Sequence, residues 1–459
     1  MLKEQNRPTY AELIGEIVQK SQDPISIEEI TRRVGHIRPS RSRTPKGTIR
    51  NAIIYCEMVT HVGQGKYGWY PRLINGSRVR VPLISCDGYL EKIVFDDEAQ
   101  NLLRTPSFTS DSKPVDLRLP NGAHASLQLE LSRNRVWETA ASPELWQWLK
   151  KCSAASGDAL IIEAVDTEAR CYSAVYESQR KRDAAAIRDR TKEIENVSLD
   201  YVEDRDLYPS LFGLAERLLA RGYYKHPVPP EPISCIWNRV APDPTEQSAY
   251  ADWVIGRRQV GGNKKSRSVY QLKILLSESN PPIWRRVLAT DTTTLNDLHW
   301  IIQQSMGWTD CHLHQFIIDG QYYSDPEFGL HGCGADIRDE CNITLREIGA
   351  KKPDRFFYEY DFGDRWFHEI VIEKIDRLNS DGYYPQCIGG ARACPPEDSH
   401  GVDCYADFLR AIQDPGHYDH EESLVWIKGY FDPEHFNLDL VNKKFRYGTQ
   451  EAGRGSRKQ

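Results

Sequence analysis

Several features that would narrow the function are absent from this sequence. No apolar run in its 459 residues approaches the roughly 20 residues that a membrane-spanning helix needs. No N-terminal signal segment is present, so we expect a cytoplasmic protein whose 11 cysteines stay reduced. No two cysteines are spaced as Cys-x-x-Cys, which excludes the tight thiolate pairs of a zinc ribbon. The length predicts about two to four domains, each with its own core.

Charge is unevenly distributed along the chain. The net charge is −7, but residues 1–80 carry 14 Lys and Arg against 7 Asp and Glu, whereas residues 269–446 carry 17 against 30. No acidic residue occurs between Thr31 and Cys56. Only the N-terminal region is therefore electrostatically suited to a phosphate backbone.

The N-terminal pattern predicts three helices and a hairpin. A first amphipathic helix covers residues 10–20, and a second begins at the capping-box pair Ser26 and Glu29 and ends at Gly35. A third begins with Thr44 as its N-cap and a proline in its first turn. Two short strands around a glycine turn follow. This order of elements is typical of a winged helix.

The stretch from Thr9 to Tyr70 also resembles the HARE-HTH class of winged-helix modules, in the Thr-Pro start of its third helix and in its glycine-bearing wing. We therefore place a winged helix in residues 1–75. Its acid-free basic run is the footprint of a recognition helix and its preceding loop against DNA phosphates. The expected DNA contacts are Arg38, Arg41, Arg43, Lys46, Arg50, Asn51 and Lys66. The alternative is a solvated basic face that serves protein contacts.

Residues 80–238 carry strand and helix signals but no motif with recognisable chemistry. A charged helix over residues 179–195 interleaves both signs, which indicates a solvated helix rather than a nucleic-acid surface. We expect a small α+β or β-barrel domain of unknown type. Residues 239–268 contain prolines, paired glycines and a basic run, and are expected to form a linker.

The stretch from Phe356 to Glu373 predicts a β-hairpin. Aromatic and β-branched residues alternate with polar ones on both sides of a turn over residues 361–364. The Asp-Phe-Gly triplet in this turn is not a kinase motif, because no Gly-rich loop, strand lysine or catalytic loop accompanies it.

The elements around this hairpin predict an α+β domain with a mainly antiparallel sheet in residues 269–446. A strand pair, a helix over residues 294–306 and a hairpin over residues 312–323 precede it. A loop over residues 383–402 and two closing helices follow it. Residues 447–459 are expected to form a disordered tail.

Five motifs accompany the hairpin in a fixed order: PPIWRR from Pro281, Leu298-His299, Met306-Gly307-Trp308, His312-Leu313-His314, and the segments around Cys387 and Cys394. With them, residues 270–446 resemble the plasmid pRiA4b ORF-3-like family. The resemblance implies association with plasmids and mobile elements, in some cases as a resolvase-like transposon passenger. It implies no catalytic role for any individual residue.

Two groups of residues in this domain are candidate metal ligands. Cys387 and Cys394, on either side of an expected Gly-Gly turn, predict a structural zinc that His312, His314 or Cys404 completes. The alternative is buried reduced thiols and ordinary hydrogen-bonded histidines.

The second group has the residue types of a divalent-metal hydrolase: Asp361, Asp364, His368, Glu397 and Asp398. The alternative is that Asp361 and Asp364 cap the hairpin turn and pair with Arg285, Arg286 or Arg365.

These observations predict a non-enzymatic, DNA-associated protein of a plasmid, transposon or defence-like system. DNA is the expected partner of the N-terminal domain, and a protein is the expected partner of the acidic C-terminal domain. A metal-dependent nuclease or recombination factor and a structural adaptor are the alternatives.

Overall fold

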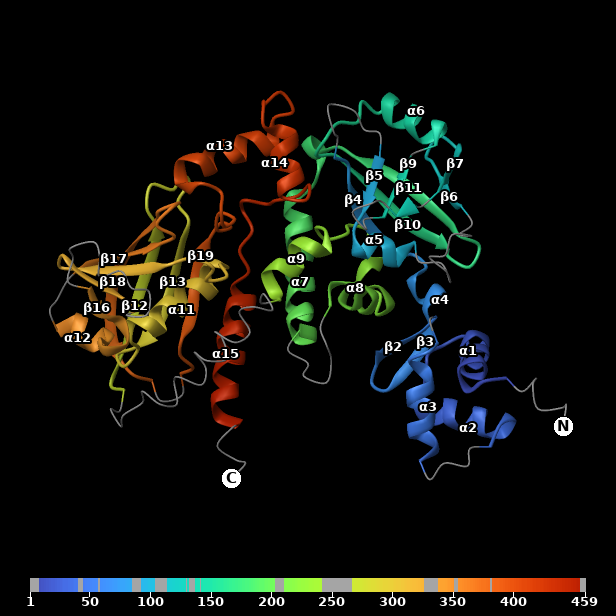
Figure 1. Cartoon of the computed structure of the whole chain (residues 1–459), viewed down its shortest axis with the longest axis horizontal. Helices are drawn as coiled ribbons and strands as arrows, with labels where there is room; N and C mark the ends of the chain where they lie inside the picture. Colours follow the sequence, from blue (N-terminus) through green and yellow to red (C-terminus); the bar gives the residue numbers. More distant parts are fainter. Residues whose placement is uncertain are drawn as a thin grey trace. The chain divides into compact units, whose positions relative to one another are not determined.

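The computed structural model describes residues 8–39, 44–56, 58–84, 92–103, 114–128, 130–131, 137–140, 142–202, 210–241, 266–325, 337–350, 354–379 and 382–454. The chain divides into two compact units (Figure 1). Unit 1 comprises Met1–Ile194, Asp204–Trp237 and Tyr418–Tyr430, and unit 2 comprises Glu195–Glu203, Asn238–His417 and Phe431–Gln459. Within the described ranges, no helix is long and apolar enough to cross a membrane.

Unit 1 begins with three helices and a small sheet of strand order β1-β3-β2. These elements are α1 (Tyr10–Lys20), β1 (Ile25–Ser26), α2 (Ile27–Ile37), α3 (Pro45–Ile53), β2 (Val59–Gly63) and β3 (Lys66–Trp69). The three helices bury one apolar core, to which α1 contributes Leu13, Ile14, Ile17 and Val18 and α2 contributes Ile27, Ile30 and Val34. The predicted helices and hairpin are therefore present.

One of the predicted helix ends was wrong in detail. Helix α2 does not end at Gly35 but continues to Ile37, because Gly35 stays helical and the backbone N–H of Arg38 closes the last turn on the Val34 carbonyl. Thr44 is the N-cap of α3 and proline begins the helix, as predicted, although the Thr44 hydroxyl makes no capping hydrogen bond. The predicted cap at Ser26 is confirmed, since its Oγ accepts the Glu29 N–H at 3.2 Å.

The middle region of the chain is α+β. Its elements are α4 (Tyr70–Ile74), β4 (Arg78–Pro82), β5 (Lys92–Phe95), α5 (Asp97–Leu102), β6 (Val115–Arg118), β7 (His124–Leu127), β8 (Glu130–Leu131), β9 (Trp137–Ala140), α6 (Pro143–Lys151), β10 (Ala159–Asp166), β11 (Cys171–Glu177), η1 (Gln179–Lys181), α7 (Ala184–Val202), α8 (Leu211–Ala220), η2 (Tyr223–Lys225) and α9 (Ile233–Val240). One sheet has the strand order β4-β10-β11-β6-β7 and another has the order β5-β9-β8. In the described part of the chain the first sheet has two free edges, so it is not the alternative β-barrel.

Arg72 connects the N-terminal helices to this region. Its guanidinium donates to the carbonyls of Ser21 at 2.6 Å and Gln19 at 2.9 Å, at the C-terminal end of α1. A cation at this end also complements the helix dipole. The helical N-terminus and the middle region accordingly fall within one compact unit.

The segment over residues 179–195 that was predicted as one solvated helix begins with η1 and continues in α7 from Ala184, and the prediction was incomplete. One stripe of α7 is buried: Ile187, Thr191, Ile194, Glu195, Ser198 and Leu199. Glu195 is a buried carboxylate that accepts hydrogen bonds from Arg239 at 2.5 Å and Asn437 at 2.9 Å. These bonds and the Arg239 charge outweigh burial and lower the pKa of Glu195 to about 2. The interleaved charges concealed this buried stripe.

Unit 2 is built on an eight-stranded sheet of order β16-β15-β14-β17-β18-β12-β13-β19. Its strands are β12 (Ser268–Leu276), β13 (Trp284–Thr290), β14 (His314–Ile318), β15 (Gln321–Ser324), β16 (Ile337–Asp339), β17 (Arg355–Tyr360), β18 (Trp366–Arg377) and β19 (Gln386–Ala391). All neighbouring strands are antiparallel except β15 and β16, which confirms the predicted α+β class with a mainly antiparallel sheet.

The helices of the C-terminal part are α11 (Leu295–Met306), η5 (Glu340–Asn342), α12 (Leu345–Ala350), α13 (Gly401–Gln413), α14 (His420–Trp426) and α15 (Leu438–Arg454) (Figure 1). Helix α14 falls in unit 1 and the others in unit 2. Helix α15 was not predicted, and it continues past Arg446 into the expected tail. The expected linker begins inside α9, and residues 242–265 of it lie outside the described residues.

The predicted central hairpin is β17 and β18. Tyr360 pairs with Trp366 at its closed end, and Phe356, Tyr358 and Tyr360 are buried on one face of β17, as the period of two predicts. The turn depends on left-handed backbone at Asp361, with φ 56°, and at Arg365, with φ 57°.

The predicted loop over residues 383–402 contains strand β19, so the expected Gly-Gly turn was wrong. Gly389 and Gly390 lie in this strand and pair with β13. A Cβ at Gly390 would lie 2.6 Å from the ring of Phe436 and 3.0 Å from the side chain of Arg285. Glycine is therefore required here by close packing, not by a turn.

Arg285 is the most unusual residue of the unit 2 core, because its side chain is only 2% exposed. It does not pair with Asp361 or Asp364, as one prediction had it. Its guanidinium donates to the backbone carbonyls of Ser305 at 2.7 Å, Trp284 at 2.9 Å and Ala391 at 3.0 Å. The neighbouring Arg286 instead pairs with Glu373 at 2.6 Å.

Replacing Arg285 by methionine should lower the free energy of unfolding of unit 2 by about 3 kcal/mol or more, because carbonyls inside the domain lose their donor. Arg286→Met is the matched control and should cost less than about 1 kcal/mol, because its ion pair is near the surface. Hydrogen-exchange mass spectrometry over residues 268–440, carried out at increasing denaturant concentration, measures both changes. Equal losses in the two variants would contradict this role of Arg285.

Candidate functional site

The predicted DNA contacts lie in the N-terminal helices, and the structure describes five of the seven. Lys46, Arg50 and Asn51 are exposed on α3, and Lys66 is exposed at the start of β3. Arg38 is half-buried, donates to the Pro8 carbonyl at 2.6 Å and lies 4.6 Å over the ring of Tyr10. The other two, Arg41 and Arg43, lie outside the described residues.

Acidic residues of α2 neutralise part of the basic run. Lys46 forms an ion pair with Glu28. Glu29 accepts from Arg32 at 2.7 Å and from Arg33 at 2.6 Å, and these hydrogen bonds lower the pKa of Glu29 to about 2. The segment from Thr31 to Cys56 contains no acidic residue, but carboxylates from the preceding residues lie next to several of its cations.

Two cations of the predicted surface are not neutralised by a neighbouring carboxylate. Among the described residues, Arg50 and Lys66 have no acidic partner within ion-pair distance. The hairpin also gains a cation that the sequence analysis did not assign, since the Arg221 guanidinium would lie 3.8 Å from a Cβ at Gly63.

The structure does not bring the predicted zinc ligands together. Cys387 is buried in β19, and its thiol donates to the Gly389 carbonyl at 3.5 Å. Burial raises the pKa of both Cys387 and Cys394, which favours the protonated thiol over a metal-binding thiolate. Cys404 is exposed on α13. No cysteine belongs to any potential metal-ligand group that the described residues form.

The two histidines of the same prediction belong to different groups. His314 lies with His299 and Asp310, and His312 lies with Asp361 and Asp398. The ligand atoms within each group lie within 4.8 Å of one another. Both groups lie in unit 2, near the end of α11 and the hairpin turn.

The first group belongs to a polar network in the core of unit 2. Helix α11 carries Asn296, His299 and Gln303 at the spacing of three and four residues that defines one helical face. Asn296 donates to Glu340 of η5 at 3.0 Å. His299 Nδ1 lies 2.8 Å from the Tyr358 hydroxyl, which also accepts from Gln303 Nε2 at 3.1 Å. His299 Nε2 lies 3.0 Å from an Asp310 carboxylate oxygen. The Tyr358 hydroxyl, the His299 imidazole and the Asp310 carboxylate therefore form a chain of successive polar contacts.

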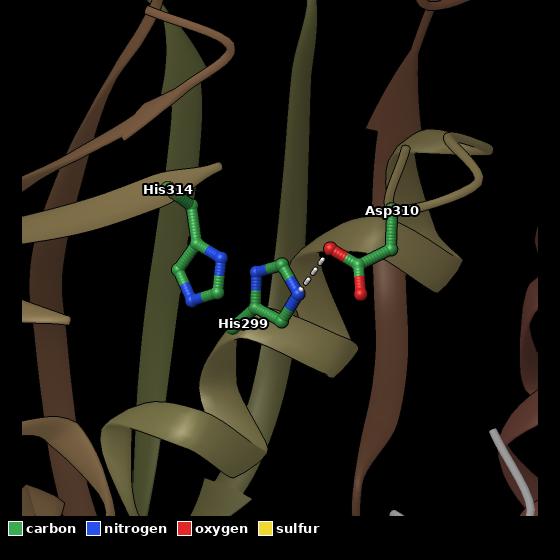
Figure 2. A group of neighbouring side chains, drawn as sticks. All are labelled: His299, Asp310 and His314. Atoms are coloured by element: carbon green, nitrogen blue, oxygen red, sulfur yellow. Dashed lines mark ion pairs between the residues drawn. The ribbon is translucent and has the colours of Figure 1, made fainter. Parts of the chain in front are cut away.

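Figure 2 shows His299 between His314 and Asp310. The two imidazole rings are stacked, with centroids 3.5 Å apart and an interplanar angle of 6°. On its other side, His314 Nε2 lies 3.0 Å from the buried carboxylate of Glu340. The charge of His314 and its hydrogen bond lower the pKa of Glu340 despite its burial. Burial, together with the charge of His314, lowers the pKa of His299.

The residues of the predicted hydrolase site do not act as one group. His368 is fully buried and donates through Nδ1 to the Trp366 carbonyl at 3.0 Å. Burial lowers the pKa of His368 to about 3, so it is a neutral core residue. Glu397 accepts from the hydroxyls of Tyr360 and Thr309, each at 2.5 Å. Asp364 Oδ2 accepts the His400 backbone N–H at 2.8 Å. Of the predicted set, Asp361 and Asp398 are the two that lie together, beside His312.

Sequence reasoning missed the polar stripe of α11. The apolar stripe of the same helix was predicted, and it is buried as expected: Leu295, Leu298, Ile301 and Ile302. The signal was the repeat of Asn296, His299 and Gln303 on a second helical face.

The C-terminal part of the chain is thus an α+β domain with an eight-stranded sheet and a buried polar network beside α11. Residues 268–440 match the family model described as plasmid pRiA4b ORF-3-like protein, and the chain belongs to this family through that domain. The predicted resemblance is thus confirmed over nearly the predicted range. The match does not include the N-terminal helices, whose resemblance to HARE-HTH modules stays a prediction.

Two proteins are similar to part of this chain. The uncharacterized protein y4hQ of Sinorhizobium fredii is 34% identical over 179 residues, which are 38% of this chain and 90% of that protein. A protein of unknown function from Methanosarcina mazei Go1, known from its crystal structure, is 32% identical with a TM-score of 0.35. The match covers 38% of this chain and 98% of that one.

Unit 2 should lose stability as the pH falls from about 7 to about 5. The folded-state pKa values of His299 and His368 are lowered, so the unfolded chain takes up their protons first below the usual histidine pKa of about 6.5. Each histidine that stays neutral in the folded chain contributes up to about 1.4 kcal/mol per pH unit.

His299→Gln should reduce this pH dependence, as denaturant unfolding at several pH values would show. His400→Gln is the control, because its side chain is 82% exposed and should leave the pH dependence unchanged. An unchanged slope in His299→Gln would mean that His299 is protonated in the folded chain.

Proposed function

We propose that residues 9–70 form a winged helix that binds DNA, and that the protein is a DNA-associated protein of a mobile-element or plasmid setting. The element order α1, β1, α2, α3, β2, β3 supports the winged helix, because β2 and β3 would form the wing and β1 adds the short third strand. In such modules the third helix enters the major groove.

The observation that carries the proposal is the surface of α3. This helix has no acidic residue, begins at Pro45 and exposes Lys46, Arg50 and Asn51. A helix N-terminus and exposed cations both favour phosphate oxygens. Lys66 and Arg221 add positive charge at the hairpin that would be the wing. The protein-contact alternative predicts no salt-dependent DNA affinity.

The C-terminal domain is proposed as a protein-interaction module. Residues 269–446 carry 30 acidic against 17 basic side chains, so a phosphate backbone would be repelled. The names of the similar proteins give no activity that would favour another role. The alternative nuclease or recombination function draws support only from the His312, Asp361 and Asp398 group.

Arg50→Glu should weaken DNA binding by about tenfold at low salt and reduce the slope of log affinity against log salt by about 1, because one phosphate contact is lost. Glu28→Gln should strengthen binding, because it releases Lys46 from its ion pair. Fluorescence anisotropy with a random duplex, repeated over a salt series, measures both effects.

Lys20→Glu is the matched control, because Lys20 is an exposed α1 cation already paired with Glu16. It should leave the affinity nearly unchanged. Simultaneous charge reversal at Arg41, Arg43, Lys46 and Arg50 should abolish the gel shift. Retained binding in that variant would remove the DNA-binding proposal and favour the protein-contact alternative.

A further inference from the structure

We propose that His312, Asp361 and Asp398 form a binding site for one divalent first-row transition ion, with Zn²⁺ or Mn²⁺ as the expected ions. The three side chains come from the segment before β14, from the β17–β18 turn and from the segment before α13. All three lie in unit 2, so the site does not depend on the proposed DNA binding.

The distances within this group fit coordination better than hydrogen bonding. His312 Nε2 lies 3.6 Å from Asp361 Oδ2 and 3.3 Å from Asp398 Oδ1. Both separations exceed the about 2.7–3.2 Å of an N–H···O hydrogen bond. Ligands that bind one ion at about 2.1 Å lie about 3.0 Å apart at right angles and about 3.4 Å apart in a tetrahedron. The two separations from His312 lie near the tetrahedral edge, and all three ligand atoms lie within 4.8 Å of one another.

Asp361 is held ready for such an ion. The residue is 8% exposed. Its Oδ1 accepts the backbone N–H groups of Gly363 at 2.9 Å and Asp364 at 3.3 Å. Its Oδ2 has no hydrogen-bond donor among the described residues and faces His312. A cation between His312 and Asp361 would bind the carboxylate oxygen that faces the imidazole.

The segment that carries Asp398 is tied to the same turn. Asp364 Oδ2 accepts the His400 backbone N–H at 2.8 Å. Gly401, at φ 85°, lies so close to the turn that an added Cβ would be 2.6 Å from the Asp364 carbonyl oxygen. These contacts hold the segment in place, as bonds around metal ligands commonly do.

The group in Figure 2 is the rival site, and its geometry disfavours it. The ligand lone pairs of imidazole lie in the ring plane, so the parallel rings of His299 and His314 do not converge on one ion. His299 Nδ1 is already hydrogen-bonded with the Tyr358 hydroxyl, and Nε2 lies 3.0 Å from an Asp310 carboxylate oxygen. That group is therefore a polar core network.

The ligand atoms indicate the class of ion. One imidazole nitrogen and two carboxylate oxygens suit Zn²⁺ or Mn²⁺, whereas Ca²⁺ takes about six to eight oxygens. The side chain of Asp398 is 72% exposed, which leaves room for water or another ligand on the ion. The site differs in this respect from the closed cysteine site that the sequence predicted.

The test uses the full chain, purified without a histidine tag and stripped of metal with a chelator. Equilibrium dialysis with Zn²⁺ should give about one ion per chain. Asp398→Asn should weaken binding at least about tenfold to 100-fold. Asp361→Asn should do the same, because an asparagine oxygen still accepts the turn hydrogen bonds but carries no charge. Asp403→Asn, an exposed acid on α13, is the matched control and should bind as the unchanged chain does.

Two further measurements distinguish the rival sites. Asp310→Asn should leave the affinity unchanged, and loss of binding in this variant would assign the ion to the group in Figure 2. The Co²⁺-loaded chain should lack the intense near-ultraviolet band of a cobalt-thiolate bond, and its presence would assign the ion to cysteine. Either result, or less than one tightly bound ion in the unchanged chain, would overturn the proposal.

Discussion

The buried guanidinium of Arg285 is the constraint on which the packing of unit 2 depends. A charge in a core is tolerated only when its donors are satisfied. Here backbone carbonyls of α11, β13 and β19 satisfy it, so one side chain fixes three elements. It also lies 4.4 Å from the Phe436 ring, just before α15. The PPIWRR motif and the paired glycines of β19, far apart in sequence, serve one interaction.

Much of the fold could be predicted because it follows from local periodicity. The alternation in β17 and the apolar stripe of α11 require only neighbouring residues, and both are confirmed. Strand β19 could not be predicted, because paired glycines are typical of turns. The reason for Gly390 is its close packing against Arg285 and Phe436, which the local sequence does not reveal. Helix α15 was missed because its charged, glycine-bearing C-terminal half suggested a disordered tail.

The candidate sites were harder to predict, because they depend on which side chains meet. Glu28 and Lys46 are paired across 18 positions of the sequence, so the acid-free window overstated the free charge. The position of Cys387 and Cys394 on either side of an expected Gly-Gly turn suggested zinc, but burial raises the pKa of both thiols. The two histidines of one motif, His312 and His314, face different groups. Residue types alone did not separate these cases.

Gly401 has a mechanical consequence. The helix α13 begins at this residue, whose Cα lies directly against the backbone of the β17–β18 turn. Because no side chain separates the two backbones, no side-chain rearrangement can accommodate a displacement of one relative to the other. A shift of the β17–β18 turn would therefore also move the first residues of α13. The polar side of this helix is exposed to solvent. The position of the hairpin turn and the position of the first residues of α13 are therefore coupled through this contact.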